Sequence, residues 1–173
     1  MTLSSSSNTI NALGIFGRLE PRQEKYFLKL SEKYSRYPEN NDAIGIFNHL
    51  SLVVNNNVEV GEIASHLDLL KKLKPHLPFR LTVSKPIIID DKHIALSFDI
   101  KQTQKIRNLA KRTITGHVVE TYYTKVVWYV PKNKQQEVMD ILKNIKEMTF
   151  YDFKLCANRQ DDQSTIYSSL KFK

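Results

Sequence analysis

The residues best suited to chemistry lie in an apolar stretch at residues 44–54, which reads IGIFNHLSLVV. This pattern predicts a strand, in which successive side chains point to opposite faces of a sheet. Leu50 and Leu52 then face a core, while His49 and Ser51 lie about 7 Å apart on the other face. Histidine is suited to proton transfer because its ordinary pKa lies near neutrality. A lone histidine in a strand is also commonly structural, so its placement within the whole chain has to decide its role.

Composition is that of a soluble globular protein with an excess of positive charge. The 173 residues are enough for one domain with a sizeable core, and 41% are hydrophobic and 25% charged. The formal net charge of +8 favours anionic partners such as RNA, nucleotides or a membrane surface. The basic residues are scattered through several segments, so part of this charge is solvated surface.

Several classes of site are excluded by what the sequence lacks. The single cysteine, Cys156, rules out an internal disulfide, fits a reducing compartment, and sits in an apolar strand pattern that predicts burial. No apolar run approaches the ~18 residues needed to cross a bilayer, so we expect no membrane segment. The sequence contains no metal-ligand cluster, phosphate-binding glycine loop or nucleophile elbow, and we expect neither a metal nor a cofactor.

The amino-terminal end of the chain differs in composition from the rest. Residues 1–12 are predicted to be a flexible tail, and residues 13–173 a single domain. The amino-terminal segment has no acid before Glu20 and only one arginine, which makes it similar to a mitochondrial presequence but poor in arginine. A cytoplasmic or nuclear location is the stronger expectation.

Apolar periodicity predicts an α+β fold without a regular βαβ rhythm. Helices are predicted over about 21–36, from Ile63 to Pro75, over 102–113 and over 132–148. Strands are predicted at 44–54, 79–83, 87–89, 94–100, 118–130, 150–157 and 164–172, with turns at 55–57 and 90–91.

This order of elements, together with HLSLVV at 49–54, resembles the two-histidine phosphoesterases, the superfamily of bacterial 2′-5′ RNA ligase-like proteins and cyclic nucleotide phosphodiesterases. The first motif of that family typically reads like HLTL, and residues 150–172 are similar to its closing strand pair. The resemblance covers most of residues 20–173. It implies a bilobal α+β fold with antiparallel sheets flanked by helices, and two His-x-Ser/Thr motifs on paired central strands.

The resemblance also implies a mechanism. In the family, one imidazole acts as general base on the attacking water or hydroxyl, and the other protonates the leaving oxygen. Neighbouring Ser or Thr hydroxyls hold the non-bridging phosphate oxygens, and no metal is required. Here His49 takes the place of the base and Ser51 that of a phosphate-holding hydroxyl.

The second motif departs from the family pattern, because the strand before the last helix contains no His-x-Ser/Thr. The best match puts Tyr122 in the histidine place, as a catalytic residue, and Thr124 in the hydroxyl place. A shift by one residue instead puts Tyr123 and Lys125 there as substrate-binding residues, and such a shift reverses every side chain. The sequence leaves both registers open. Tyrosine, with an ordinary pKa near ~10, is a poor base but can donate a proton.

The remaining histidines are predicted to be peripheral. His93 and His117 are expected at the surface near strand starts, His66 on a helix surface and His76 in a loop.

Two functions of different classes follow, each for a monomer. The first is a divergent phosphoesterase that binds RNA ends or nucleotide phosphates in a central cleft, with weak cyclic phosphodiesterase activity and His49 as the base. The second is an inactive scaffold that binds RNA or protein, either by itself or as part of a ribonucleoprotein. Such a scaffold would hold RNA through Thr124, Lys125 and the aromatic residues Tyr122, Tyr123 and Trp128, because aromatic faces stack on bases and cations bind phosphates.

Overall fold

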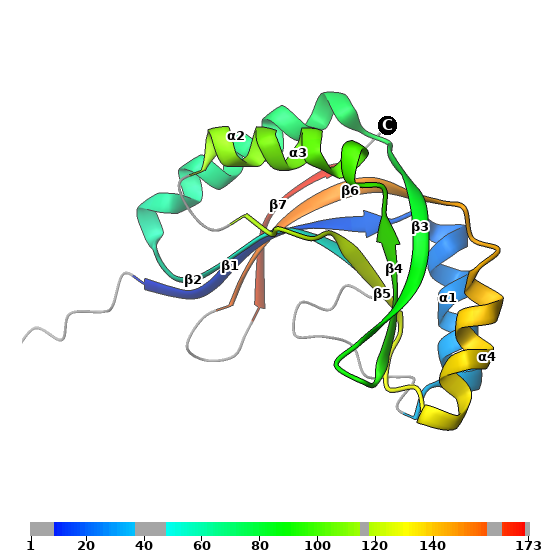
Figure 1. Cartoon of the computed structure of the whole chain (residues 1–173). Helices are drawn as coiled ribbons and strands as arrows, with labels where there is room; N and C mark the ends of the chain where they lie inside the picture. Colours follow the sequence, from blue (N-terminus) through cyan, green and yellow to red (C-terminus); the bar gives the residue numbers. More distant parts are fainter. Residues whose placement is uncertain (1–8, 37–47, 115–117, 159–163, 172–173) are drawn as a thin grey trace, which may run out of the picture.

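The computed structural model describes residues 9–36, 48–114, 118–158 and 164–171. Within these residues, seven strands form one antiparallel sheet in the order β2-β1-β6-β3-β4-β5, with β7 also paired to β6 (Figure 1). The strands are β1 (Thr9–Leu19), β2 (His49–Glu59), β3 (Phe79–Ile89), β4 (His93–Phe98), β5 (Tyr123–Val127), β6 (Glu147–Asn158) and β7 (Ser164–Lys171).

Four α-helices lie on this sheet in the described part of the chain. They are α1 (Pro21–Tyr34), α2 (Ile63–Leu73), α3 (Ile100–Thr113) and α4 (Lys132–Leu142), and short 3-10 helices span Val60–Glu62 and Lys74–His76. None of the helices among the described residues is long and apolar enough to span a membrane.

Strand β6 joins two lobes (Figure 1). Its first residues, Glu147 to Phe150, pair with β3, and the other half of β3 pairs with β4. From Asp152 onwards, β6 pairs with β7 on one side and β1 on the other. Helices α2 and α3 cover the lobe of β1, β2 and β7, while α1 and α4 cover the lobe of β3, β4 and β5. This confirms the predicted bilobal α+β fold with antiparallel strands flanked by helices.

The buried faces of the strands share one hydrophobic core, which orients β2. Leu50 and Leu52 are fully buried in it, as the alternation predicts, and His49 and Ser51 are half-buried on the other face. Full burial of a leucine side chain is worth about 1.5–3 kcal/mol. A shift of β2 by one residue would expose both leucines and bury the polar pair, so the core fixes the direction in which His49 points.

Some element boundaries differ from the prediction. Residues 55–57 are not a turn, because β2 continues to Glu59 while Asn55 and Asn56 pair with Leu13 and Ala12 of β1. The predicted helix over 132–148 ends at Leu142, and the segments 79–83 and 87–89 belong to one continuous strand. The first strand begins at Thr9, ahead of the boundary assigned to the tail. Residues 44–47 of the predicted first motif strand lie outside the described residues.

The strand predicted over 118–130 is also shorter, since β5 covers only Tyr123–Val127. Val118 forms an isolated bridge with Val53 of β2 instead of continuing β5. Beyond β5, Tyr129 has a left-handed φ of 50°, which is incompatible with an extended strand.

Two histidines expected at the surface are buried, so both predictions are wrong. Nε2 of His66 accepts a hydrogen bond from Nδ2 of Asn55 at 3.3 Å, and Nδ1 donates to the Glu62 carbonyl at 2.8 Å. A ring with both nitrogens satisfied can be buried at little cost. His93 is 3% exposed and lies beside Trp128, with 4.7 Å between the ring centroids. His76 is exposed, and His117 lies outside the described residues.

Gly14 of β1 makes room for an aromatic ring behind the first motif. A Cβ at this position would lie 2.5 Å from Cζ of Phe16 and 2.9 Å from the Val53 carbonyl oxygen. The Phe16 ring in turn meets the His49 ring edge-on, with 5.1 Å between centroids. Phe16 and Cys156 form a small second apolar cluster, which confirms the predicted burial of the cysteine.

We therefore expect Gly14→Ala to destabilise the fold by about 1–3 kcal/mol, because the added methyl group must displace both the Phe16 ring and the β2 backbone. Denaturant unfolding followed by circular dichroism measures the loss. Gly61→Ala is the matched control, since nothing lies within 4 Å of a Cβ at Gly61, and it should change stability by less than about 0.5 kcal/mol. Equal losses in the two variants would contradict the close packing at Gly14.

Candidate functional site in the cleft between β2 and β5

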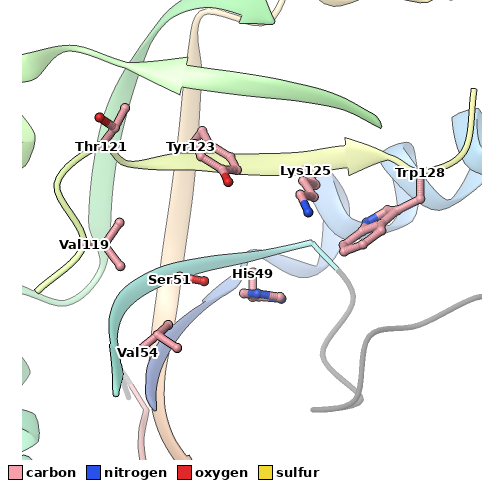
Figure 2. Close-up of a pocket in the computed structure, with 8 residues that line it drawn as sticks. All are labelled: His49, Ser51, Val54, Val119, Thr121, Tyr123, Lys125 and Trp128. Carbon is pink, nitrogen blue, oxygen red and sulfur yellow. The ribbon is translucent and has the colours of Figure 1, made fainter. Parts of the chain in front are cut away.

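A cleft of about 380 Å³ lies between β2 and β5, the two strands at the ends of the sheet order. Figure 2 shows side chains from both strands pointing into it. Its lining consists of His49, Ser51, Val54, Val119, Thr121, Tyr123, Lys125 and Trp128. The volume falls within the range of about 300–1,000 Å³ that is usual for small-molecule sites.

The structure distinguishes the two registers of the second motif. Tyr123 and Lys125 face the cleft opposite His49 and Ser51, whereas Tyr122 is 4% exposed and Thr124 fully buried on the other face of β5. The placement of Tyr122 and Thr124 in the site is therefore corrected. Both belong to the side of β5 that also buries Val126 in the core.

Burial has consequences for these two residues. It raises the pKa of Tyr122 above its ordinary value of 10, so its hydroxyl is a still weaker acid than that of a solvated tyrosine. Neither the Tyr122 hydroxyl nor the Thr124 hydroxyl has a hydrogen-bond partner among the described residues. Neither residue is among those that line the cleft.

The residue before His49 ties the two cleft strands together. Asn48 is 1% exposed and has a left-handed φ of 52°, a conformation that asparagine tolerates better than most residues. Its Nδ2 donates to the backbone carbonyls of Lys125, at 2.8 Å, and of Val126, at 3.1 Å. These bonds set the start of β2 directly against the part of β5 that carries Lys125.

A second link closes the other end of the cleft. The Val119 backbone N–H donates to the Leu52 carbonyl at 3.3 Å, next to the bridge between Val53 and Val118. Between the two links, β2 and β5 are not paired as a ladder in the described residues. The cleft lies in this gap, and the lining side chains surround it.

Lys125, Trp128 and His93 form a cluster at one end of the cleft. Nζ of Lys125 lies 4.7 Å from the centroid of the Trp128 ring, within cation–π range, and the His93 ring centroid lies 4.7 Å from the same ring. Nδ1 of His93 accepts a hydrogen bond from the Tyr129 backbone N–H at 3.1 Å. Trp128 thus contacts both a cation and a buried imidazole.

The His93 ring is neutral in this arrangement. Burial, with the positive charges of Lys125 and Lys92 acting in the same direction, lowers the pKa of His93 from 6.5 to about 4. A protonated ring could not accept the hydrogen bond from Tyr129. His93 therefore supports Trp128 and adds no charge to the cleft at neutral pH.

The chemistry available in the cleft is that of an anion site. An imidazole and a serine hydroxyl face a phenol and an ammonium group, and none of the lining residues is acidic. No cluster of three or more His, Cys, Asp or Glu side chains suited to a metal ion occurs among the described residues. Thr121 also lines the cleft, from a bend two residues before the start of β5, and strand alternation in the sequence gives no signal for it.

No protein-family model matches the sequence, and no curated protein matches it. Among solved structures, E. coli LigT in its apo form matches with a TM-score of 0.53 at 12% identity, over 95% of this chain and 98% of LigT. Usb1 of Kluyveromyces marxianus matches with a TM-score of 0.53 at 9% identity, over 94% and 99%. A structure described as a phosphoesterase matches with a TM-score of 0.51 at 12% identity, over 94% and 99%.

All three belong to the two-histidine phosphoesterase superfamily. The chain has the two-histidine phosphoesterase fold. Its first motif, His49 and Ser51, lies on one cleft strand. On the second cleft strand, β5, Tyr123 and Lys125 face the cleft. The two-histidine phosphoesterase pattern leads us to expect a histidine and a Ser or Thr at these two places.

Asn48→Asp tests the link between the cleft strands. Aspartate keeps the size of asparagine and its tolerance of positive φ, but its carboxylate has no N–H to donate to the two carbonyls. We expect a loss of about 1–3 kcal/mol in unfolding free energy, measured by denaturant titration. Asn57→Asp is the control, since Asn57 also has a positive φ, 54°, and is exposed. A loss as large in Asn57→Asp would show that charge at a left-handed asparagine, not the link, is responsible.

The lowered pKa of His93 predicts a pH dependence of stability. The folded state disfavours protonation, so the contribution of neutral His93 is complete above about pH 6.5 and is lost as pH falls towards about 4. The unfolding free energy, measured with urea, should fall less between about pH 7.5 and about pH 5 in His93→Gln than in the wild type. The exposed His76 gives the control, and His76→Gln should keep the wild-type loss. A wild-type loss in His93→Gln would contradict the assignment.

Proposed function

We propose that the cleft binds the phosphate of a nucleotide or an RNA end, and that it has weak cyclic phosphodiesterase activity with His49 as the general base. The observation that carries this proposal is the placement of His49 and Ser51 on β2 opposite Tyr123 and Lys125 on β5 in one cleft. The fold matches of E. coli LigT include structures complexed with phosphate and with ATP, at TM-scores of 0.53 and 0.51, which supports a phosphate ligand.

Three of these side chains suit the phosphate itself. The Lys125 ammonium would neutralise one non-bridging oxygen, and the Ser51 hydroxyl would donate a hydrogen bond to the other. The Tyr123 hydroxyl would donate its hydrogen bond to the bridging ribose oxygen. Half-buried positions strengthen such charge-assisted bonds, since less water competes for the anion. The Trp128 ring at the end of the cleft provides an apolar face next to this phosphate position.

Hydrolysis of a 2′,3′-cyclic phosphate needs one proton removed and one supplied. His49 takes the proton of the attacking water as its oxygen bonds to phosphorus, and Tyr123 donates its proton to the ribose oxygen when the P–O bond breaks. Lys125 stabilises the charge that develops on the phosphoryl oxygens. A tyrosine hydroxyl is a weaker acid than an imidazolium, so turnover is expected to be slower than with two histidines.

A second candidate is an RNA-binding scaffold without turnover. The observation in its favour is that the second cleft strand presents an aromatic ring and a cation, Tyr123 and Lys125, where a second histidine is expected. Aromatic faces stack on bases and cations bind phosphates, so binding needs no second histidine. Binding is common to both candidates, and only hydrolysis separates them.

The test is hydrolysis and binding of a short RNA with a 2′,3′-cyclic phosphate end, compared with the same RNA ending in a 3′-hydroxyl. His49→Ala should abolish turnover, and Lys125→Met should weaken binding of the cyclic-phosphate RNA by about 10–100-fold, the value of a charge-assisted hydrogen bond. Fluorescence anisotropy measures the affinity, and chromatography of the RNA products measures turnover.

Two adjacent tyrosines provide the matched control. Tyr123→Phe and Tyr122→Phe remove the same hydroxyl from neighbouring residues on opposite faces of β5. Turnover should fall in Tyr123→Phe and stay at the wild-type level in Tyr122→Phe. Binding of the cyclic end without turnover in the wild type would select the scaffold. Equal affinity for both RNA ends in the wild type would refute phosphate recognition by the cleft.

A further inference from the structure

Helix α3 carries an unusual concentration of positive charge. Its 14 residues include no acidic side chain and five basic ones. The basic residues are Lys101, Lys105, Arg107, Lys111 and Arg112. The helix thus carries a charge of +5, whereas the formal net charge of the whole chain is +8. Charge of one sign on one helix is the electrostatic pattern of a surface that meets a polyanion.

Only part of this charge is neutralised within the protein. Arg107 and Lys111 both contact Glu120, at 3.3 Å and 3.4 Å. Lys105 and Arg112 are exposed and have no ion pair among the described residues. These two cations are available to an anion from outside.

A cavity of about 350 Å³ lies directly beside these free cations. Its apolar part comes from Phe79, at the start of β3, and from Ile106 and Leu109 of α3, while Lys105 and Arg112 are among its polar lining residues. Phe79 is half-buried and packs against Phe153, with 6.2 Å between ring centroids. The ring is therefore held in place as part of the wall.

The polar side of the cavity follows one face of α3. Lys105, Asn108 and Arg112 are spaced three and four residues apart, so they lie in a row along the helix, with the two cations about 10 Å apart along its axis. The lining of this cavity includes no acidic residue and shares no residue with the cleft. It is a separate site of cationic and apolar character.

We propose that this face of α3 and its cavity form a second site, which binds a segment of single-stranded nucleic acid. Lys105 and Arg112 bind backbone phosphates, and an unstacked base enters the cavity over Phe79, Ile106 and Leu109. Single-stranded nucleic acid presents the alternation of anionic and flat apolar groups that this surface complements. The site stands on its own observations and does not depend on the function proposed for the cleft.

The experiment compares two double variants that remove the same charge. Lys105→Gln/Arg112→Gln neutralises the α3 site, and Lys25→Gln/Lys29→Gln neutralises two exposed lysines of α1. The ligand is a labelled single-stranded RNA of about twelve nucleotides with a 3′-hydroxyl, so that no terminal phosphate is offered to the cleft. Fluorescence anisotropy is recorded over a salt series from about 50 to 200 mM.

We expect the α3 variant to bind at least about tenfold more weakly than the wild type and the α1 variant less than about twofold. The slope of log K against log salt should fall by about 1.4 in the α3 variant, since two phosphate contacts are lost at about 0.7 each. A duplex of the same length should bind more weakly than the single strand, because its bases are stacked and cannot enter the cavity.

Four outcomes would overturn the proposal. They are an equal loss in both double variants, no loss in the α3 variant, tighter binding of the duplex, and binding of a poly-glutamate peptide with the same dependence on Lys105 and Arg112. Single variants of the cleft separate the two sites. If Lys125→Met abolishes binding of the 3′-hydroxyl RNA and the α3 variant does not weaken it, the cleft is the sole RNA site and only the α3 proposal fails.

Discussion

The two hydrogen bonds from the Asn48 side chain to the backbone of β5 are the constraint on which the cleft depends. Strands β2 and β5 are the ends of the sheet order, and a complete ladder between them would close the sheet and leave no space for a ligand. The amide of Asn48, together with the bridge at Val53 and Val118, joins them only at the ends of the gap. A buried amide that loses its partners is costly, so this spacing is firmly held. Because His49 follows Asn48 directly, the same bonds place the imidazole opposite Lys125.

The sequence predicted one side of this cleft and not the other, for a physical reason. In β2 the two faces differ sharply, since leucines alternate with a histidine and a serine, and only one register buries the leucines. In β5 each register offers a tyrosine followed two residues later by a residue able to bind phosphate, so polarity does not decide. The register is set by pairing with β4 and by contacts such as Asn48 to Lys125 and Val126, which join residues far apart in the chain.

Long-range pairing also explains the other differences between prediction and structure. Three consecutive asparagines are a strong local turn signal, yet β1 pairs along residues 55 and 56 and keeps them in β2. The buried Asn55 side chain then provides the partner that allows His66 to be buried on α2. Helical and strand periodicity were sufficient for the number, type and order of most elements. Periodicity could not predict the side-chain environments that depend on a partner distant in sequence, such as the burial of His66 against Asn55.

The residues on β5 change the electrostatics of the cleft as well as its proton chemistry. Lys125 brings a cation to a strand where the resemblance leads us to expect a neutral hydroxyl, and its charge helps to lower the pKa of the buried His93 beside Trp128. Under the proposed functions, the cleft and α3 would then act over different ranges. The cleft acts at contact distance through half-buried groups, which salt screens little, whereas the exposed cations of α3 act over about 8–10 Å and are screened. The salt-dependent part of the affinity for a nucleic acid would therefore come mainly from α3, and discrimination of its end from the cleft.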